Sequence, residues 1–260
     1  MRHEEETHRT APGNESGEAL LTLHGVHKRY GEVVALHGID LTLHRGEVVV
    51  ILGPSGCGKS TLLRTINGLE PIQGGEISMV GVGVFGRDVS WDQVRQKVGM
   101  VFQSYELFAH MNVIDNILLG PLKVQKRDRA EAEAEADRLL ERVGLLARKQ
   151  AWPRELSGGQ KQRIAIVRAL CMNPEVILLD EITAALDPEM VREVLDVVLE
   201  LAREGMSMII VTHEMGFAEK VADRIVFMDQ GWIIEEGAPA EFFARPQTER
   251  ARVFLNGLDY

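Results

Sequence analysis

The sequence predicts an α/β protein with a mainly parallel sheet that is flanked by helices. The run at residues 48–52 is continuous and apolar, which is typical of a strand that is buried on both faces. From Gly159 onward, strand-like runs alternate with segments of helical spacing, and this alternation indicates parallel pairing. Hydrophobic residues make up 45% of the 260 residues. That content supports one large domain with room for a smaller subdomain.

The N-terminal half contains most of the short β-like runs. Strands are expected at residues 19–30, 38–46, 48–52, 74–85 and 97–102. A helix with apolar residues at helical spacing follows the glycine-rich loop and ends at Gly68. Residues 86–93 are interpreted as a turn-rich connection between two of these strands.

The second half begins with a helical segment, at about residues 107–154, which is expected to be an inserted lobe. Within it, Leu139, Leu140 and Val143 face one way while a dense charged face is solvated. The alternation then resumes, with helices expected at residues 160–172, 188–203 and 214–222 and strands at 176–180, 207–212 and 224–229. Ligands of such sheets bind at the carboxyl ends of the strands.

Charge and chain-end composition exclude several classes of protein. Acidic residues outnumber basic residues by 39 to 29, so no overall positive field attracts nucleic acid, which is not expected as a partner. Residues 1–18 are polar and are expected to form a flexible tail without a signal peptide. No apolar run approaches a membrane span. Cys57 and Cys171 lack disulfide or metal-site spacing, which favours a reducing cytosol.

A phosphate-binding loop lies between the strand at residues 48–52 and the helix that follows. The residues that satisfy G-x-x-x-x-G-K-[ST] are Gly53, Pro54, Ser55, Gly56, Cys57, Gly58, Lys59 and Ser60, and Thr61 continues into the helix. Backbone N–H groups and the helix N-terminus would surround phosphate oxygens. Lys59 would neutralise the β- and γ-phosphates, and the Ser60 hydroxyl would bind Mg²⁺. The expected ligands are therefore ATP and Mg²⁺.

Two carboxylates end the buried strand at residues 176–180. Asp180 would hold Mg²⁺, generally through water, and Glu181 would polarise the attacking water. An acidic pair at a strand end can also be a helix cap or a solvated turn, but the phosphate loop favours the catalytic interpretation.

A second anion-binding helix N-terminus is expected at Ser157, Gly158, Gly159 and Gln160. These residues resemble the signature of ATP-binding-cassette (ABC) ATPases, with residues 53–60 as Walker A and 176–181 as Walker B. The resemblance implies a P-loop NTPase core, an antiparallel β subdomain and an inserted helical subdomain within residues 19–260. It also implies a head-to-tail homodimer, in which the signature of one subunit acts on the nucleotide of the other.

Four further residues receive roles from the resemblance. Gln103 would sense Mg²⁺ and the attacking water at a hinge to the helical lobe, and His213 would contact the γ-phosphate and orient Glu181. Tyr30 would stack on adenine, and Asp187 would cross the dimer interface. Without the family, Gln103, His213 and Tyr30 would be ordinary strand-end residues. Asp187 also suits the N-cap position before a helix, and both roles are compatible.

Two positions depart from the family or add to it. Ile182 follows Glu181 where the family usually has proline, and no loss of the chemical step is expected. Cys57 lies beside Lys59 at a helix N-terminus, which predicts a lowered thiol pKa. Alkylation at Cys57 would then block nucleotide binding; the alternative is a small, tolerated spacer.

The chain further resembles the importer subunits for polar amino acids from about Leu20 to the C-terminus. The segments that carry this likeness are 101–103, 107–108, His110, 115–117, 120–121, 156–163, 212–215 and 217–218. The resemblance implies a motor on the cytoplasmic face of the inner membrane, with separate permease subunits and, indirectly, a substrate-binding protein. Glutamine, glutamate, arginine, histidine or a related solute is implied, with an ectoine-type compatible-solute importer as a near alternative.

A groove for the permease is expected between Gln103 and the helical lobe. Its candidate lining is Tyr105, Leu107, Phe108 and Met111, although such a cluster can equally be core. Other classes stay open: an exporter motor, a soluble ABC ATPase of DNA repair or translation, and a catalytically silent regulatory cassette. The presence of Lys59, Asp180, Glu181 and His213 argues against the last.

Overall fold

The computed structural model describes residues 17–257, so residues 1–16 of the predicted tail lie outside the described part. The strands are β1 Ala19–Tyr30, β2 Val33–His44, β3 Val48–Leu52, β4 Gly74–Met79, β5 Gly83–Val84, β6 Val98–Val101, β7 Val176–Asp180, β8 Ser207–Val211, β9 Arg224–Asp229 and β10 Trp232–Gly237. The α-helices are α1 Lys59–Ile66, α2 Trp91–Lys97, α3 Val113–Lys123, α4 Arg129–Arg142, α5 Gly158–Leu170, α6 Pro188–Arg203, α7 Met215–Val221, α8 Pro239–Ala244 and α9 Glu249–Asn256. Two short 3₁₀ helices are η1 Leu146–Arg148 and η2 Pro153–Glu155.

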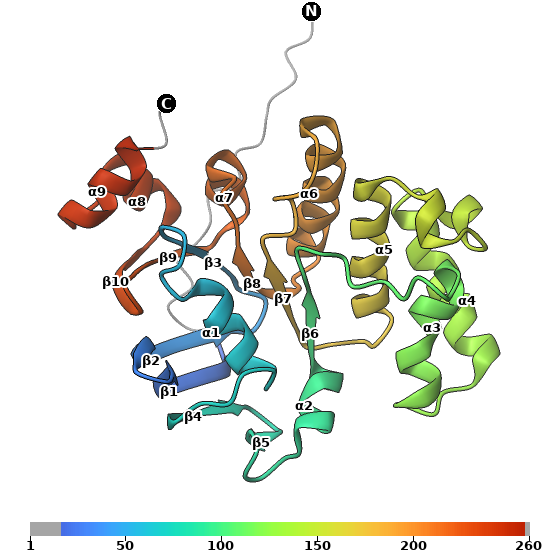
Figure 1. Cartoon of the computed structure of the whole chain (residues 1–260), viewed down its shortest axis with the longest axis horizontal. Coiled ribbons are helices and arrows are strands. Elements are labelled where there is room, and N and C mark those ends of the chain that lie inside the picture. The colour runs from blue at the N-terminus through green and yellow to red at the C-terminus, as the bar shows by residue number, and fades with distance from the viewer. Residues whose placement is uncertain (1–16, 258–260) are drawn as a thin grey trace, which may run out of the picture.

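The larger sheet confirms the predicted α/β class. Its strand order is β10-β9-β3-β8-β7-β6, and every neighbouring pair is parallel except β9 with β10. Figure 1 shows helices on both sides of this sheet. Because parallel strands end at the same edge, the loops after β3, β7 and β8 lie together. This edge is where ligands of such sheets bind.

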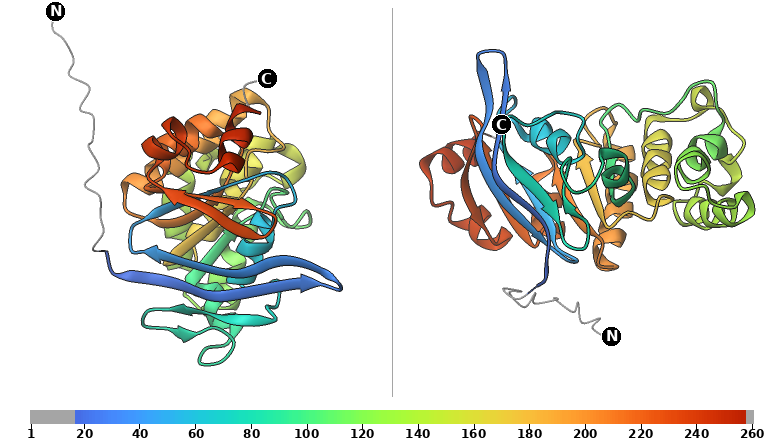
Figure 2. Two further views of the ribbon diagram at one scale, coloured as in Figure 1. Left: turned by 90° about the vertical axis from the view of Figure 1, so that its left-hand side faces the viewer. Right: turned by 90° about the horizontal axis from the view of Figure 1, so that it is seen from below.

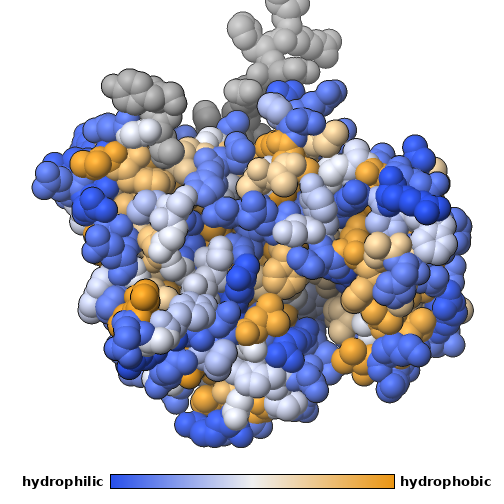
Figure 3. Space-filling model, in the orientation of Figure 1, coloured by the Kyte–Doolittle hydropathy of each residue, from blue (hydrophilic) through white to orange (hydrophobic). Residues whose placement is uncertain are grey.

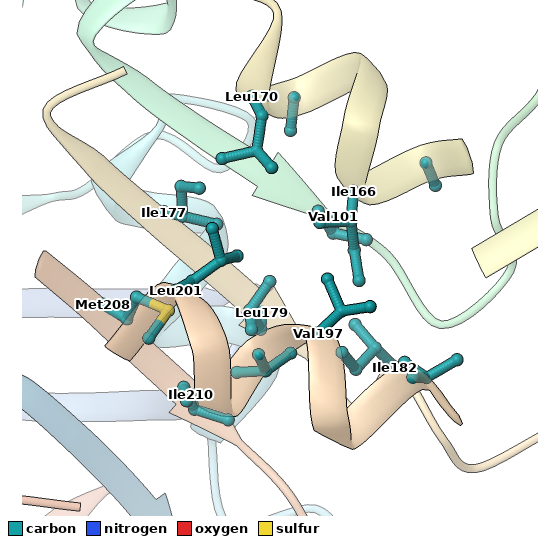
Figure 4. Close-up of a cluster of buried hydrophobic side chains, with 14 of the residues drawn as sticks. Val101, Ile166, Leu170, Ile177, Leu179, Ile182, Val197, Leu201, Met208 and Ile210 are labelled. Carbon is teal, nitrogen blue, oxygen red and sulfur yellow. The ribbon is translucent and has the colours of Figure 1, made fainter. Parts of the chain in front are cut away.

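Each central strand is apolar at every position because alternate side chains enter two different cores. On β3, Val48, Val50 and Leu52 belong to one buried cluster, and Val49 and Ile51 belong to the other. The first cluster lies under α5 and α6, where side chains from β7, β8 and both helices meet (Figure 4). Each fully buried aliphatic side chain stabilises the fold by about 1.5–3 kcal/mol.

The second core lies between the larger sheet and a smaller antiparallel sheet of order β2-β1-β4-β5, with α1 contributing to it. The sequence runs at residues 19–30 and 38–46 are thus confirmed as strands, and β2 begins earlier, at Val33. The tip of the long β1–β2 hairpin projects beyond the body of the molecule (Figure 2). This hairpin carries Tyr30 to one end of the cavity described below.

Helices α3, α4 and α5 pack against one another at one side of the molecule (Figure 1). The inward stripe of α4 consists of Ala132, Ala136 and Leu140, with Val143 directly after the helix. Leu139, which was expected on that stripe, is only partly buried, because it lies one residue off the i, i+4, i+8 row that faces the core. Asp128 caps the helix by accepting hydrogen bonds from two backbone N–H groups.

The prediction of a turn-rich connection at residues 86–93 is wrong at the end of that segment, because α2 begins at Trp91. Ser90 and Gln93 form a reciprocal capping box at its N-terminus. Val94 is the buried residue of α2, so no apolar periodicity marks this helix. Strand β10 and helices α8 and α9 were not predicted either.

Among the described residues, no helix is both long and apolar enough to cross a membrane. The face in Figure 3 is largely hydrophilic, with apolar side chains in small separate groups.

A partly buried ion pair lies between the two sheets. Arg224 on β9 donates to the Glu47 carboxylate at 2.8 Å, to Glu236 at 2.6 Å and to the carbonyl of Thr42. Burial raises the pKa of the Glu47 carboxyl, but hydrogen bonds from Arg224 and the His44 backbone, with the guanidinium charge, outweigh it and hold the pKa below 4.5. A carboxylate with a lowered folded-state pKa stabilises the fold above its unfolded pKa, and this contribution is lost as pH falls through the folded-state value.

We therefore expect Arg224→Met to lower the free energy of unfolding by about 2 kcal/mol at pH 7, because the partly buried Glu47 carboxylate loses its guanidinium partner and keeps only the hydrogen bonds to His44. The difference from wild type should shrink as the pH falls through the lowered folded-state pKa of Glu47. Urea unfolding at a series of pH values from 7 downward measures this change. Arg154→Met, at an exposed site, is the control; an equal loss at every pH would contradict the assignment.

Candidate functional site

The loop between β3 and α1 has room for glycine alone at two positions. Gly53 has φ +152°, and a Cβ there would lie 2.1 Å from the Met228 carbonyl oxygen. Gly58 has φ +107°, and its Cβ would lie 2.8 Å from the Ala35 carbonyl oxygen. The glycines therefore let the loop pack against β9 and β2 while its backbone turns around the predicted phosphate position.

Lys59 lies inside this loop and is only 4% exposed. Its ammonium donates to the carbonyls of Gly53 at 2.9 Å and Pro54 at 3.0 Å. It forms no ion pair with a carboxylate of the described residues within 4.0 Å. A buried ammonium held by carbonyl dipoles and by the Cys57 sulfur has unneutralised charge, which is suited to an anionic phosphate.

Ser60 and Asp180 come together although they are distant in sequence. The Ser60 hydroxyl donates to the Asp180 carboxylate at 2.6 Å, and Arg64 lies 3.9 Å from that carboxylate. Burial raises the pKa of Asp180, and the Ser60 bond and Arg64 oppose the shift only partly. Two hard oxygen donors, one of them a carboxylate whose charge is disfavoured by burial, fit a cation such as Mg²⁺. The described residues contain no cluster of three or more His, Cys, Asp or Glu for another metal.

Glu181 and His213 follow neighbouring strands and touch. The His213 Nε2 lies 3.0 Å from the Glu181 Oε1. Glu181 adopts a left-handed conformation with φ 48°, and its N–H donates to the Val211 carbonyl at 2.9 Å. This fixed turn directs the carboxylate to the cavity, which Glu181 helps to line.

A cavity of about 850 Å³ joins the phosphate loop to the tip of the β1–β2 hairpin. Its loop end is lined by Ser55, Gly56, Gly58, Lys59, Ser60, Thr61 and Glu181, and its other end by Tyr30, Val33, Val34, Ala35, His37, Gln230, Gly231 and Trp232. Tyr30 is 45% exposed, and the Lys28 ammonium lies 4.6 Å from its ring centroid. His37 and Trp232 were missed from the sequence, because no local motif marks them.

Gln103 is exposed after β6 and does not line the cavity. The next residues are held by α5: Arg168 donates to the carbonyls of Tyr105 at 3.2 Å and Glu106 at 2.6 Å. Tyr105 and Glu106 are both left-handed, with φ 63° and 50°. Gln162, also on α5, donates to the Phe102 carbonyl at 3.1 Å. Residues 102–106 are therefore attached to the helix that begins at the predicted signature.

Ser157 and Gln160 form a capping box at the start of α5. Gly158 packs where a Cβ would lie 2.9 Å from the Tyr105 hydroxyl oxygen. None of residues 157–160 lines the cavity. Asp187 occupies the N-cap position of α6 without a side-chain cap hydrogen bond and is exposed. One subunit thus leaves the predicted signature and Asp187 apart from its own phosphate loop.

Among the predicted docking residues, Phe108 is 43% exposed, whereas Leu107 packs against the core of the larger sheet. Tyr105 and Met111 are half-buried. The cluster is therefore partly surface and partly core. Buried Asn116 shapes it by accepting from the Phe108 N–H and donating to the Phe108 carbonyl.

The predicted lowering of the Cys57 thiol pKa is wrong. Cys57 is buried, and burial raises the pKa of its thiol more strongly than the Lys59 charge lowers it. A thiol in this state is protonated at neutral pH and is not an activated nucleophile.

Ile182 stands where the family usually has proline, and it contributes a buried side chain to the core. Its side chain is buried and points into the apolar cluster that contains Leu179 and Val197 (Figure 4). The branched side chain thereby anchors the chain directly after Glu181.

The chain is similar in sequence to proteins of known families. Residues 36–184 match the family described as ABC transporter, and residues 153–219 also match an AAA domain family. The chain is 54% identical to the glutamine transport ATP-binding protein GlnQ of Geobacillus stearothermophilus over 237 residues, which cover 91% of this chain and 98% of that protein. It is 53% identical to the glutamate/aspartate import ATP-binding protein GltL of Escherichia coli K12, with the same two coverages.

Solved structures agree with the fold. The cbiO1 subunit of the cbiONQ ABC transporter complex from Clostridium perfringens has a TM-score of 0.78 and 34% identity, over 88% of this chain and 92% of that one. An ATP-binding cassette in a dimeric post-hydrolysis state bound to ADP and Pi has a TM-score of 0.75 and 31% identity, over 85% of this chain and 99% of that one.

Proposed function

The chain belongs to the ABC transporter family and is an ATP-hydrolysing subunit of that kind, and from this premise we propose that it powers the import of glutamine, glutamate or a closely related amino acid. The observation that carries the proposal is identity above 50%, over nearly the full length of both chains, to subunits named for transport of glutamine and of glutamate and aspartate.

The phosphate end of the cavity would bind the triphosphate. Loop N–H groups and the Lys59 ammonium supply positive charge where the phosphates are negative. Ser60 and Asp180 would hold Mg²⁺, with Gln103 approaching once the lobe closes. The metal, when bound, neutralises developing phosphate charge.

Glu181 would polarise the attacking water. Its carboxylate lines the cavity and is held by the left-handed turn and by His213. His213 would keep the Glu181 side chain in position and place its own ring near the γ-phosphate. Because phosphoryl transfer needs little covalent chemistry, positioning the water and stabilising charge provide most of the rate enhancement.

A second copy of the chain would complete the site. Ser157, Gly158 and Gly159 do not line the cavity of their own subunit, and the start of α5 offers backbone N–H groups to an anion. A head-to-tail homodimer would bring this start to the partner's nucleotide, with Asp187 crossing between the two sites. ATP binding would close the dimer and hydrolysis would release it.

Transport would require separate permease subunits, which the chain would meet at the cytoplasmic face of the inner membrane. Phe108 and the surrounding half-buried side chains would contact them, beside the segment that carries Gln103. A substrate-binding protein would act on this subunit only through the permease.

Uptake in a deletion strain tests the proposal. We expect the wild-type chain to restore uptake of labelled glutamine, glutamate or aspartate, and the Glu181→Gln chain to restore none. Arginine, histidine and ectoine are the comparison solutes. Restored uptake of ectoine alone, or of no solute while the purified protein hydrolyses ATP, would overturn the proposed substrate class.

A further inference from the structure

We propose that Trp232, backed by His37, forms a second aromatic wall of the nucleotide site and contacts the nucleoside part of bound ATP. The inference rests on the proposed placement of the triphosphate at the loop and adds a binding residue to it.

The position of Trp232 is fixed by a turn that touches the phosphate loop. Gln230 and Gly231, with φ 48° and 80°, form the two-residue turn between β9 and β10. The Gly231 N–H donates to the Cys57 carbonyl at 2.9 Å, and the Gly231 carbonyl accepts from the His37 N–H at 3.0 Å. A Cβ on Gly231 would lie 2.5 Å from the Ala35 carbonyl oxygen. Trp232 is therefore attached to both the loop and β2.

The indole has one face covered and one face available. Its ring stacks on His37, with centroids 4.8 Å apart and planes 5° apart. No other ring or cation of the described residues is paired with it, and Trp232 is 51% exposed. Tyr30 repeats this arrangement, since Lys28 covers one face of its ring.

The two aromatic side chains frame the end of the cavity that the phosphates leave free. Tyr30 pairs with Val33 across the hairpin, and His37 lies four residues beyond Val33 on β2. At the rise of a strand, Val33 and His37 are about 13 Å apart. When the triphosphate lies at Lys59, the nucleoside extends into this region, which apolar and aromatic side chains line. An exposed indole at such a place gains by covering its free face with a base or a ribose.

Binding measurements with ATP and with inorganic tripolyphosphate test the inference, because only ATP carries a nucleoside. We expect Trp232→Ala to weaken ATP binding about tenfold, which corresponds to about 1.4 kcal/mol, and to leave tripolyphosphate affinity unchanged. Trp232→Phe should recover most of the ATP affinity. ATP should change tryptophan fluorescence in the wild type and in Trp152→Phe, but not in Trp232→Phe, and tripolyphosphate should not change it in any of them.

Unchanged ATP affinity in Trp232→Ala, or an equal loss for ATP and tripolyphosphate, would overturn the inference while the uptake result stands. Failure of uptake with normal ATP binding would overturn only the proposed substrate class. Trp232 lies on an edge strand and is exposed, so circular dichroism and thermal unfolding of Trp232→Ala should match the wild type.

Discussion

Replacing Glu181 with glutamine is expected to lower ATP turnover at least about 10³-fold, within the range that a general base contributes, while ATP binding is retained. Glutamine keeps the size and the hydrogen bond toward His213 but cannot accept a proton from water. Without hydrolysis, the closed dimer should persist. Steady-state phosphate release gives the turnover, and light scattering after gel filtration in ATP gives the oligomeric state.

Glu219→Gln is the matched control, because Glu219 is an exposed glutamate on α7. It should hydrolyse ATP at the wild-type rate and return to a monomer as ATP is consumed. A Glu181→Gln protein that turns over normally would contradict the base assignment. One that binds ATP but stays monomeric would contradict the proposed head-to-tail dimer.

Replacing Lys59 with methionine is expected to weaken ATP binding by at least about 100-fold, because two or more charge-assisted contacts of about 1.5–3 kcal/mol each would be lost. Methionine keeps an unbranched apolar stem in the loop. The carbonyls of Gly53 and Pro54, which accept from Lys59, would also be left without this donor. Isothermal titration with ATP and Mg²⁺ measures the loss.

The control for this change is Lys220→Met, at an exposed lysine on α7. Its ATP affinity should equal that of the wild type. A Lys59→Met protein with unchanged affinity would show that the loop N–H groups alone hold the triphosphate. Thermal unfolding should accompany the titration, because Lys59 is buried and its removal also alters packing.

The parallel sheet could be predicted from the sequence because burial on both faces demands an apolar residue at every position, as in β3. Helix α2 could not, because it is seven residues long and Val94 is its buried position. The signal that could have found it is the capping box of Ser90 and Gln93, which does not depend on periodicity. Strand β10 escaped prediction because it is an edge strand in which no residue is fully buried.

Some parts of the site are built from consecutive residues, and others form only when distant strands pair. The phosphate loop could be predicted because its chemistry depends on consecutive backbone groups, and residues 53–60 contain them all. His37 and Trp232 meet only through pairing of distant strands, so no short motif contains both. The pKa of Cys57 was predicted in the wrong direction because neighbouring charge is visible in the sequence, whereas burial is not.

The attachment of residues 102–106 to α5 has a mechanical consequence. Gln162 and Arg168 hold this stretch at both ends, so we expect it to follow any displacement of α5. Helix α5 itself packs against β6 and α6 in the core of the larger sheet, so the attachment also ties residues 102–106 to that core. A displacement of α5 would therefore carry Gln103 and Ser157 together. A force that acts on this helix from outside would reach both residues at once.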